Sequence, residues 1–258
     1  MKAPGNVVRS SGHGTNVLLI HGTGTDGSSW LPLMRLLRDR AHLTSYDRRG
    51  TTAWPLGDAT ERITVEEHAD DAAELILDLE MGPAHVCGAS FGGAVALELA
   101  RRRPDLVLSA TLYEPVVPAS ENLPAVPTGL VADFEKLLAL RKGEEAAALF
   151  HRRVLTDEVW EALAPESRRK AESTWRHVHA DLVAGATYRL AASELGRVEV
   201  RTLLLQGGRS RRTFEPSVRV LHASLPHSER AVIPSAGHHL SGDAWAELAS
   251  VIAEFVRV

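Results

Sequence analysis

Several features are scarce in this chain of 258 residues, and each scarcity narrows what the protein can be. Cys87 is its single cysteine, so no disulfide can form within the chain and nothing points to an oxidising compartment. No apolar run approaches the roughly 20 residues that span a membrane. The first residues lack the apolar stretch of a signal peptide. We therefore expect a cytoplasmic protein with no membrane partner.

Excess charge and metal-ligand patterns are missing as well. The formal net charge is only −4, which argues against a nucleic acid or an anionic membrane as the main partner. Histidines and cysteines do not cluster at metal-ligand spacing, so we expect no metal and no organic cofactor. Hydrophobic residues make up 44% and charged residues 24%, as in ordinary globular proteins. The length suits one large domain.

Short apolar runs alternate with helical patterns at both ends of the chain. Continuous apolar runs indicate strands buried on both faces, as parallel sheets require. This alternation predicts an α/β fold with a mainly parallel, doubly wound sheet. The predicted strands are 16–20, 43–46, 84–87, 106–113, 201–206 and 230–233, with a further edge strand at 7–10. The predicted helices between them are 29–40, 64–79, 93–100, 216–224 and 243–256.

The middle of the chain carries no strand pattern. From Ala119 to Arg197 the apolar residues follow helical spacing, which predicts helices over 128–141, 144–155, 157–163, 165–179 and 181–195. An all-helical segment between two parts of one sheet predicts a lid. We thus expect a core built from residues 1–118 and 198–258, with the lid spanning 119–197.

A serine stands between a predicted strand and a predicted helix, in Gly88-Ala89-Ser90-Phe91-Gly92. A tight strand-to-helix turn forces its central residue into strained backbone angles and projects the side chain outward. Glycines on either side remove the Cβ atoms that would clash in such a turn. The G-x-S-x-G pattern in this context predicts a nucleophilic serine, whereas the alternative is an ordinary tight turn that carries a serine.

Four motifs in this order resemble the α/β-hydrolase family over nearly the whole chain. They are His21-Gly22, Tyr46-Asp47-Arg48-Arg49-Gly50, the serine turn and Ser235-Ala236-Gly237-His238. The resemblance implies that Ser90 is the nucleophile and that His238, rather than His239, is the base and then the acid. It also implies that the backbone N–H groups of Phe91 and Thr23 bind the oxyanion. For the Asp47–Gly50 turn it implies a structural role.

The sequence departs from the family at the third catalytic residue. Ser210 stands where most relatives carry an aspartate, and a neutral hydroxyl cannot stabilise the imidazolium that forms on proton transfer. Glu114, at the end of the strand after the nucleophile, is the first candidate to replace it. Glu215 is a second candidate, and a third possibility is that no acid is present. The sequence leaves all three open.

Substrate-binding residues are predicted from loops and from the lid. Arg209, with Arg211 and Arg212, could anchor an anion, while the alternative is a solvated charge cluster. Trp30, Trp175 and Tyr188 could line a pocket, although aromatic residues at helical spacing also suit a lid core.

We therefore expect a serine hydrolase (an esterase, thioesterase or lactonase) that acts on a small to medium acyl substrate, including substrates borne by coenzyme A or a carrier. Two alternatives stay open, and the altered acid loop is the ground for the first of them. One is a non-hydrolytic enzyme of the same fold, such as a lyase, cyclase or acyltransferase. The other is a ligand-binding receptor without catalytic activity. The sequence indicates neither the acyl and leaving groups nor the oligomeric state.

Overall fold

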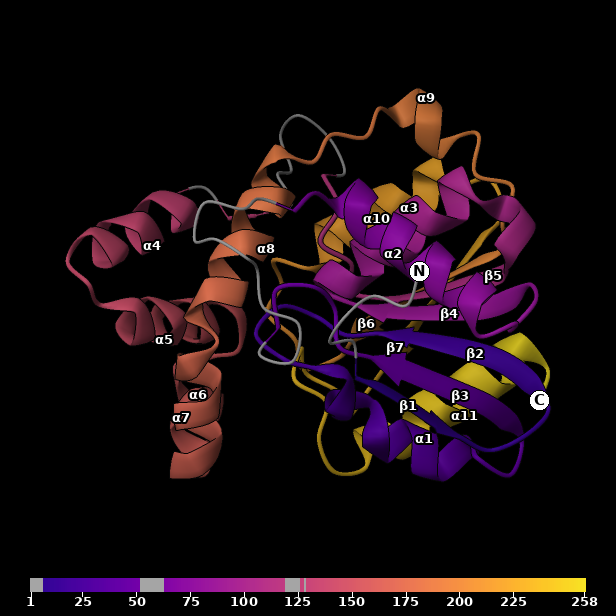
Figure 1. The fold of residues 1–258 in the computed structure, drawn as a ribbon, viewed down its shortest axis with the longest axis horizontal. Coiled ribbons are helices and arrows are strands. Elements are labelled where there is room, and N and C mark those ends of the chain that lie inside the picture. The colour runs from indigo at the N-terminus through magenta and orange to yellow at the C-terminus, as the bar shows by residue number, and fades with distance from the viewer. Residues whose placement is uncertain (1–6, 52–62, 119–125, 128) are drawn as a thin grey trace.

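The computed structural model describes residues 7–51, 63–118, 126–127 and 129–258. A seven-stranded sheet in the order β1-β3-β2-β4-β5-β6-β7 lies at its centre (Figure 1). Its neighbouring strands are parallel except for β1, which runs antiparallel to β3 at one edge. The predicted α/β class is thereby confirmed. The strands are β1 (Val8–Ser11), β2 (Thr15–Ile20), β3 (Ala41–Tyr46), β4 (Ala84–Ala89), β5 (Val107–Tyr113), β6 (Thr202–Gly207) and β7 (Ser228–Ile233).

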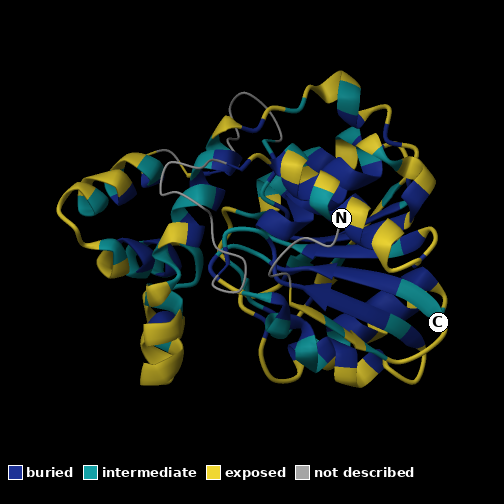
Figure 2. Cartoon of the chain, viewed as in Figure 1, coloured by how far each residue is buried: buried dark blue, intermediate teal, exposed yellow. Residues whose placement is uncertain are grey.

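Helices cover both faces of the sheet, and each layer has its own apolar core. On one face α2 (Val65–Asp78), α3 (Phe91–Arg102) and α10 (Glu215–Ser224) pack on the sheet. On the other face lie α1 (Leu31–Leu37) and α11 (Ala244–Val256). Short 3₁₀ turns, η1 (Gly27–Trp30) and η2 (Pro104–Leu106), precede α1 and β5. Figure 2 shows that the central strands and the inward helix surfaces are buried, whereas the edge strands β1 and β7 are partly exposed. Burial on both faces explains the near-continuous apolar runs of the central strands.

The N-terminus of α2 shows how local sequence sets an element boundary. Thr64 Oγ1 accepts a hydrogen bond from the Glu67 N–H at 3.1 Å, and Glu67 Oε2 accepts one from the Thr64 N–H at 2.8 Å. This reciprocal capping box satisfies two N–H groups that the first helical turn leaves without partners. The predicted start of the helix is confirmed.

Between β5 and β6 the chain forms helices α4 to α9, which we call the helical segment. Its members are α4 (Leu130–Ala139), α5 (Gly143–Val154), α6 (Asp157–Ala162), α7 (Pro165–Ser173), α8 (Trp175–Thr187) and α9 (Ala192–Leu195). In Figure 1 α4 to α7 project to one side of the sheet and α8 lies between them and the core. The predicted lid boundary at Ala119 and the predicted helix start at Thr128 lie outside the described residues.

Two of the predicted helices in this segment have wrong boundaries. The predictions placed a break between His179 and Asp181, but the break falls at Thr174, and α8 continues through Asp181 to Thr187. The Thr174 N–H and hydroxyl both bond to the Ala171 carbonyl, at 3.2 Å and 2.7 Å, and so close the last turn of α7. Periodicity could not locate this break because the apolar spacing continues across it.

None of the helices that the structure describes combines the length and the apolar composition of a membrane span.

A buried ion pair attaches α8 to the core. The guanidinium of Arg48, at the end of β3, donates to both carboxylate oxygens of Asp181, at 3.1 Å and 2.7 Å. Both side chains are almost inaccessible to solvent, at 0% and 1% exposure. Burial would by itself raise the pKa of Asp181, but the charge of Arg48 and hydrogen bonds from Arg48 and His177 hold that pKa well below its usual value. The pair therefore stays ionised inside the protein.

Three buried histidines stay neutral: His21 and His68 beside this ion pair, and His151 in α5. Burial lowers the pKa of His21 and His68 well below the usual value, and the neighbouring Arg48 lowers both further. Burial also lowers the pKa of His151 to about 4. When the chain unfolds, these rings recover an ordinary pKa of about 6.5. Below that pH the unfolded chain therefore binds more protons than the folded one.

This difference in bound protons predicts that the protein loses stability as the pH falls from about 6.5 towards 4. Each such histidine lowers the free energy of unfolding by at most about 1.4 kcal/mol per pH unit. We expect His68→Gln to reduce the slope of the unfolding free energy against pH by up to one proton, since glutamine can still accept from Arg48. Urea unfolding between pH 7 and pH 5 measures this slope. The exposed His13 provides a control, as His13→Gln should leave the slope unchanged. An unchanged slope in His68→Gln would contradict the conclusion that burial keeps His68 neutral in the folded protein.

Candidate active site

Ser90 occupies a strained turn between β4 and α3. Its φ is +54°, in the left-handed region that residues with side chains rarely adopt. Glycines make the turn possible, because a Cβ on Gly88 would lie 2.1 Å from the Gly92 carbonyl oxygen. Likewise, a Cβ on Gly92 would lie 2.3 Å from the Ile20 carbonyl oxygen. The turn is pinned to the next strand, since the Ser90 N–H donates to the Tyr113 carbonyl at 2.9 Å.

Glu114 and His238, which are 124 residues apart in the chain, meet beside this turn. His238 Nδ1 lies 2.6 Å from Glu114 Oε2. A carboxylate only accepts hydrogen bonds, so the ring donates through Nδ1–H and keeps Nε2 as its basic nitrogen. In the part of the chain that the structure describes, neither His238 Nε2 nor the Ser90 hydroxyl makes a hydrogen bond.

The Glu114 carboxylate is fixed from two sides. Its second oxygen, Oε1, accepts the N–H of Gly207 at 2.9 Å, and its own backbone N–H donates to the Leu205 carbonyl at 2.9 Å. The residue is fully buried and its φ is +43°. Strained backbone at a buried carboxylate is the kind of feature that clusters at functional sites. Glu114 is thus held as a rigid partner for the imidazole.

Two further residues, which the sequence analysis missed, orient His238. The ring of Phe214 stacks on the imidazole with 4.1 Å between ring centroids and 4° between planes. The Tyr113 hydroxyl donates to the Gly237 carbonyl at 2.6 Å and so holds the histidine loop. Phe214 lies in a loop and carries no pattern that marks it. Tyr113 could have been suspected from its place next to Glu114 at the end of β5.

Ser210, at the usual aspartate position, and Glu215, the second candidate for the acid, are placed differently. The Ser210 hydroxyl faces the Tyr113 hydroxyl across Gly207, where a Cβ would come within 2.5 Å of the first and 2.6 Å of the second. Glu215 is an exposed residue at the start of α10. Of the three alternatives left open by the sequence, the geometry therefore favours Glu114.

The two predicted oxyanion donors flank Ser90. Phe91 is the first residue of α3, where an N–H group has no acceptor within its own helix. Thr23 lies in the loop after β2, and a Cβ on the preceding Gly22 would lie 3.2 Å from the Ser90 Cβ, so this loop passes directly over the serine. The hydroxyl of Thr23 donates to Asp181 at 2.8 Å.

Two of the predicted substrate-binding residues are core residues instead. Trp30 is 2% exposed and packs edge-on against Trp245 in the core between the sheet and α11. Tyr188 is 3% exposed and its hydroxyl donates to Glu98 at 2.7 Å. Neither side chain lines the site. The sequence could not show this, because the spacing of aromatic residues does not reveal which surface covers them.

Of the three arginines after β6, Arg211 contacts the helical segment with its side chain, while Arg209 and Arg212 are exposed. Arg211 donates to the carbonyls of Arg152 and Leu155, both at 3.1 Å, and so satisfies the last turn of α5. It therefore fastens the helical segment to the core. Arg209 is exposed, and its N–H bonds to the Ala236 carbonyl at 2.8 Å. Arg212 is also exposed.

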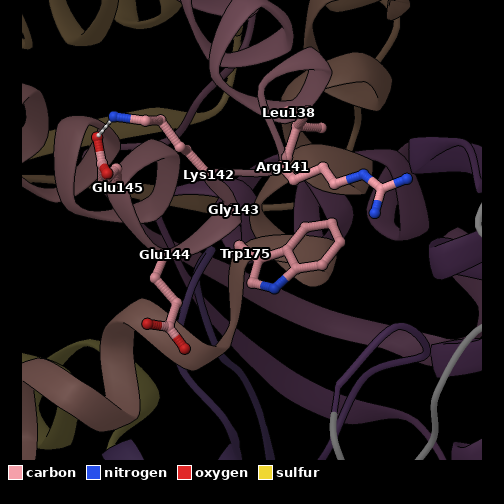
Figure 3. A pocket seen from close by; sticks show the side chains of 7 residues that line it. All are labelled: Leu138, Arg141, Lys142, Gly143, Glu144, Glu145 and Trp175. Atoms are coloured by element: carbon pink, nitrogen blue, oxygen red, sulfur yellow. Dashed lines mark hydrogen bonds and ion pairs between the residues drawn. The ribbon is translucent and has the colours of Figure 1, made fainter.

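Trp175 lines a groove on the helical segment rather than the site around Ser90 (Figure 3). The groove has a volume of about 540 Å³ and contains none of Ser90, Glu114 and His238. The indole packs on Gly143, where a Cβ would lie 2.6 Å from the ring, and the Arg176 guanidinium stacks over it at 4.0 Å. The residues that line the groove are Leu138, Arg141, Lys142, Gly143, Glu144, Glu145 and Trp175.

His151 of α5 is another residue that the sequence analysis missed. It stacks on Trp160 with 5.3 Å between ring centroids and reaches the loop after β2. A Cβ on Gly24 would lie 2.8 Å from His151 Cε1, so a side chain there would collide with the ring. The φ of Gly24 is +71°, a second reason for glycine at this position. The helical segment therefore contacts the loop after β2 through α5 as well as α8.

Neither the single thiol nor a metal cluster competes with Ser90 in the described residues. Cys87 is buried within β4, and burial raises the pKa of its thiol to about 12, so it does not form a nucleophilic thiolate near neutral pH. No group of three or more His, Cys, Asp or Glu side chains in the described part of the chain could hold a metal ion.

Several known proteins are similar to this chain. An uncharacterized hydrolase of Bacillus subtilis, YraK, is 34% identical over 106 residues, which cover 41% of this chain and 39% of YraK. A pimeloyl-[acyl-carrier protein] methyl ester esterase of Methylococcus capsulatus is 33% identical over 141 residues, 51% of this chain and 53% of that protein. The chain thus matches about half or less of these relatives' lengths.

The structural comparison covers almost the whole fold. A thermophilic esterase from Thermogutta terrifontis superposes with a TM-score of 0.79 at 23% identity, over 98% of this chain and 93% of the esterase. At this identity the likeness shows the fold alone. The family model described as the alpha/beta hydrolase fold matches residues 15–244, and this chain therefore belongs to the alpha/beta hydrolase family.

Proposed function

We propose that this protein is a serine hydrolase that cleaves carboxylic esters of small to medium acyl groups through an acyl-enzyme. The observation that carries the proposal is the 2.6 Å hydrogen bond between His238 Nδ1 and Glu114 Oε2 beside the strained turn of Ser90. A serine, a histidine and a buried carboxylate in this order are the groups that nucleophilic acyl transfer requires.

In the first half of the reaction the Ser90 hydroxyl attacks the ester carbonyl while His238 Nε2 takes its proton. The Glu114 carboxylate stabilises the imidazolium that forms, because its negative charge lies on the Nδ1 side of the ring. The N–H groups of Phe91 and Thr23 donate to the oxyanion of the tetrahedral intermediate. His238 then protonates the leaving alcohol, and the acyl group stays on Ser90.

In the second half a water molecule replaces the alcohol. His238 Nε2 takes a proton from this water as it attacks the acyl carbonyl, and the second tetrahedral intermediate uses the same two N–H donors. Its collapse releases the carboxylic acid and returns the proton to Ser90.

Three considerations support hydrolysis of esters over the alternatives. The lyase, cyclase and acyltransferase hypotheses drew on the absence of an acid at position 210, and the carboxylate of Glu114 is hydrogen-bonded to the histidine instead. The presence of both Ser90 and His238 argues against a receptor without catalytic activity. In addition, one relative is named a methyl ester esterase and another is named a hydrolase. Thioesters and lactones are cleaved by the same acyl-enzyme chemistry.

The nucleophile is tested with p-nitrophenyl acetate and butyrate and with a fluorophosphonate probe. The wild-type protein should hydrolyse these esters and become labelled at Ser90. Ser90→Ala should lose both activities while its thermal unfolding stays close to that of the wild type, because the turn accepts a small side chain. Peptide mapping of the labelled protein identifies the residue. Label on another residue, or turnover by Ser90→Ala above the background rate, would refute the proposed nucleophile.

The acid is tested by the pair Glu114→Gln and Ser210→Ala. The amide keeps the shape of Glu114 but cannot stabilise an imidazolium, so we expect kcat to fall by roughly 10³- to 10⁴-fold, as in a comparable serine protease variant. Ser210→Ala, at the usual aspartate position, should change kcat less than about threefold since no bond joins it to His238. The reverse order of effects would contradict the assignment of Glu114 as the acid.

A further inference from the structure

We propose that Asp181, a residue of α8, is a positioning residue for the oxyanion loop. By this proposal the docking of the helical segment on Arg48 fixes the Thr23 N–H where the oxyanion forms. The inference rests on the proposed function, since it concerns how that hydrolase builds its oxyanion hole. It assigns to the helical segment a part in transition-state stabilisation, beyond covering the site.

The first step of the argument is that Arg48 holds the backbone of the loop before Thr23. Its Nε–H donates to the His21 carbonyl at 3.0 Å, and its Nη2–H reaches the Gly22 carbonyl at 3.4 Å. The Arg48 backbone N–H also donates to His21 Nε2 at 3.0 Å. One buried side chain thus contacts both peptide carbonyls that lead into Thr23.

The second step is that Asp181 completes this arrangement from another element. Its Oδ2 accepts both the Arg48 Nη2–H at 2.7 Å and the Thr23 hydroxyl at 2.8 Å. An ionised carboxylate can only accept, so the Thr23 hydroxyl must point at α8. That bond fixes the Thr23 side chain and, through it, the orientation of the adjoining peptide group.

The third step is that the same cluster contacts the other oxyanion residue. The Arg48 guanidinium lies 4.7 Å from the centroid of the Phe91 ring, within cation–π distance. A Cβ on Gly185, one helical turn after Asp181, would lie 4.0 Å from the Phe91 ring. The Arg48–Asp181 pair therefore borders both residues whose N–H groups are proposed to bind the oxyanion.

The surroundings leave Asp181 fully occupied. His177 Nε2 lies 3.2 Å from its Oδ2, and His68 Nε2 lies 3.8 Å from its Oδ1. A buried ion pair contributes little net stability compared with apolar packing, whereas it fixes geometry through directional bonds. The cluster thus suits a role in placing the loop.

The decisive variant is Thr23→Val, which removes the hydroxyl but keeps the backbone N–H and nearly the same volume. We expect kcat to fall by about 10- to 100-fold with little change in KM, because a displaced donor weakens binding of the transition state more than of the substrate. The inhibition constant of a boronic acid, whose tetrahedral adduct uses the same donors, should rise by a similar factor. Thr23→Ser, which retains the hydroxyl, should recover most of the loss.

Controls separate positioning from simple loss of structure. Lys170 of α7 also ties the helical segment to the loop after β2, through Asp26 at 3.0 Å, but at the surface. Lys170→Ala should leave kcat and boronate affinity unchanged. Asp181→Asn should reproduce the Thr23→Val effect when kcat is expressed per active site titrated. If it does not fold, the two Thr23 variants still decide the matter.

The outcomes distinguish this inference from the proposed function. If the wild-type enzyme neither hydrolyses esters nor reacts with fluorophosphonate, the proposed function fails, and this inference fails with it. If the wild type is active and Thr23→Val matches it in both kcat and boronate affinity, only the positioning role of Asp181 is overturned. A rise in KM alone would also overturn it, because that result would indicate a substrate contact.

Discussion

The carboxyl ends of parallel strands meet at one edge of a sheet, and the candidate site depends on this constraint. Six residues of the site lie at or shortly after the end of six different strands, so the chain brings them together without any long loop having to reach across the molecule. Gly92 then allows the serine turn to approach the end of β2, because a Cβ there would lie 2.3 Å from the Ile20 carbonyl oxygen. The residues and the strands they follow are Thr23 after β2, Arg48 after β3, Ser90 after β4, Glu114 after β5, Gly207 at the end of β6 and His238 after β7.

The place of the acid shows how this edge tolerates change. β5 and β6 are hydrogen-bonded neighbours, so a carboxylate can approach the histidine from the end of either strand. Here it comes from Glu114 on β5, and the loop after β6 contributes the Gly207 N–H that holds its second oxygen. A serine at position 210 is therefore compatible with the proposed mechanism. In that mechanism the negative charge that stabilises the imidazolium comes from the end of β5 rather than from the loop after β6.

Local signals could be predicted from the sequence, while tertiary contacts could not. The capping box at Thr64, the strands and the glycine-flanked turn of Ser90 depend on neighbours a few residues away, and the structure agrees with each of them. The partner of His238 lies 124 residues away in the chain, so the sequence left three possibilities open: Glu114, Glu215 and no acid. Asp181 was noted only as the start of a predicted helix, and its contact with Arg48 becomes visible only when α8 is docked. Trp30 was misplaced for the same reason, because burial against α11 leaves no local pattern.

The left-handed backbone of Ser90 and Glu114 has a consequence for how this protein can evolve. Each such residue costs about 1–3 kcal/mol, which the surrounding fold must offset. Glycine at position 90 would relieve that cost without removing a hydrogen bond that the structure describes, so selection or engineering for thermal stability alone would favour losing the Ser90 side chain. Keeping it means that the fold gives up some stability for the proposed nucleophile. The most heat-resistant descendants of this sequence are therefore expected to include inactive ones.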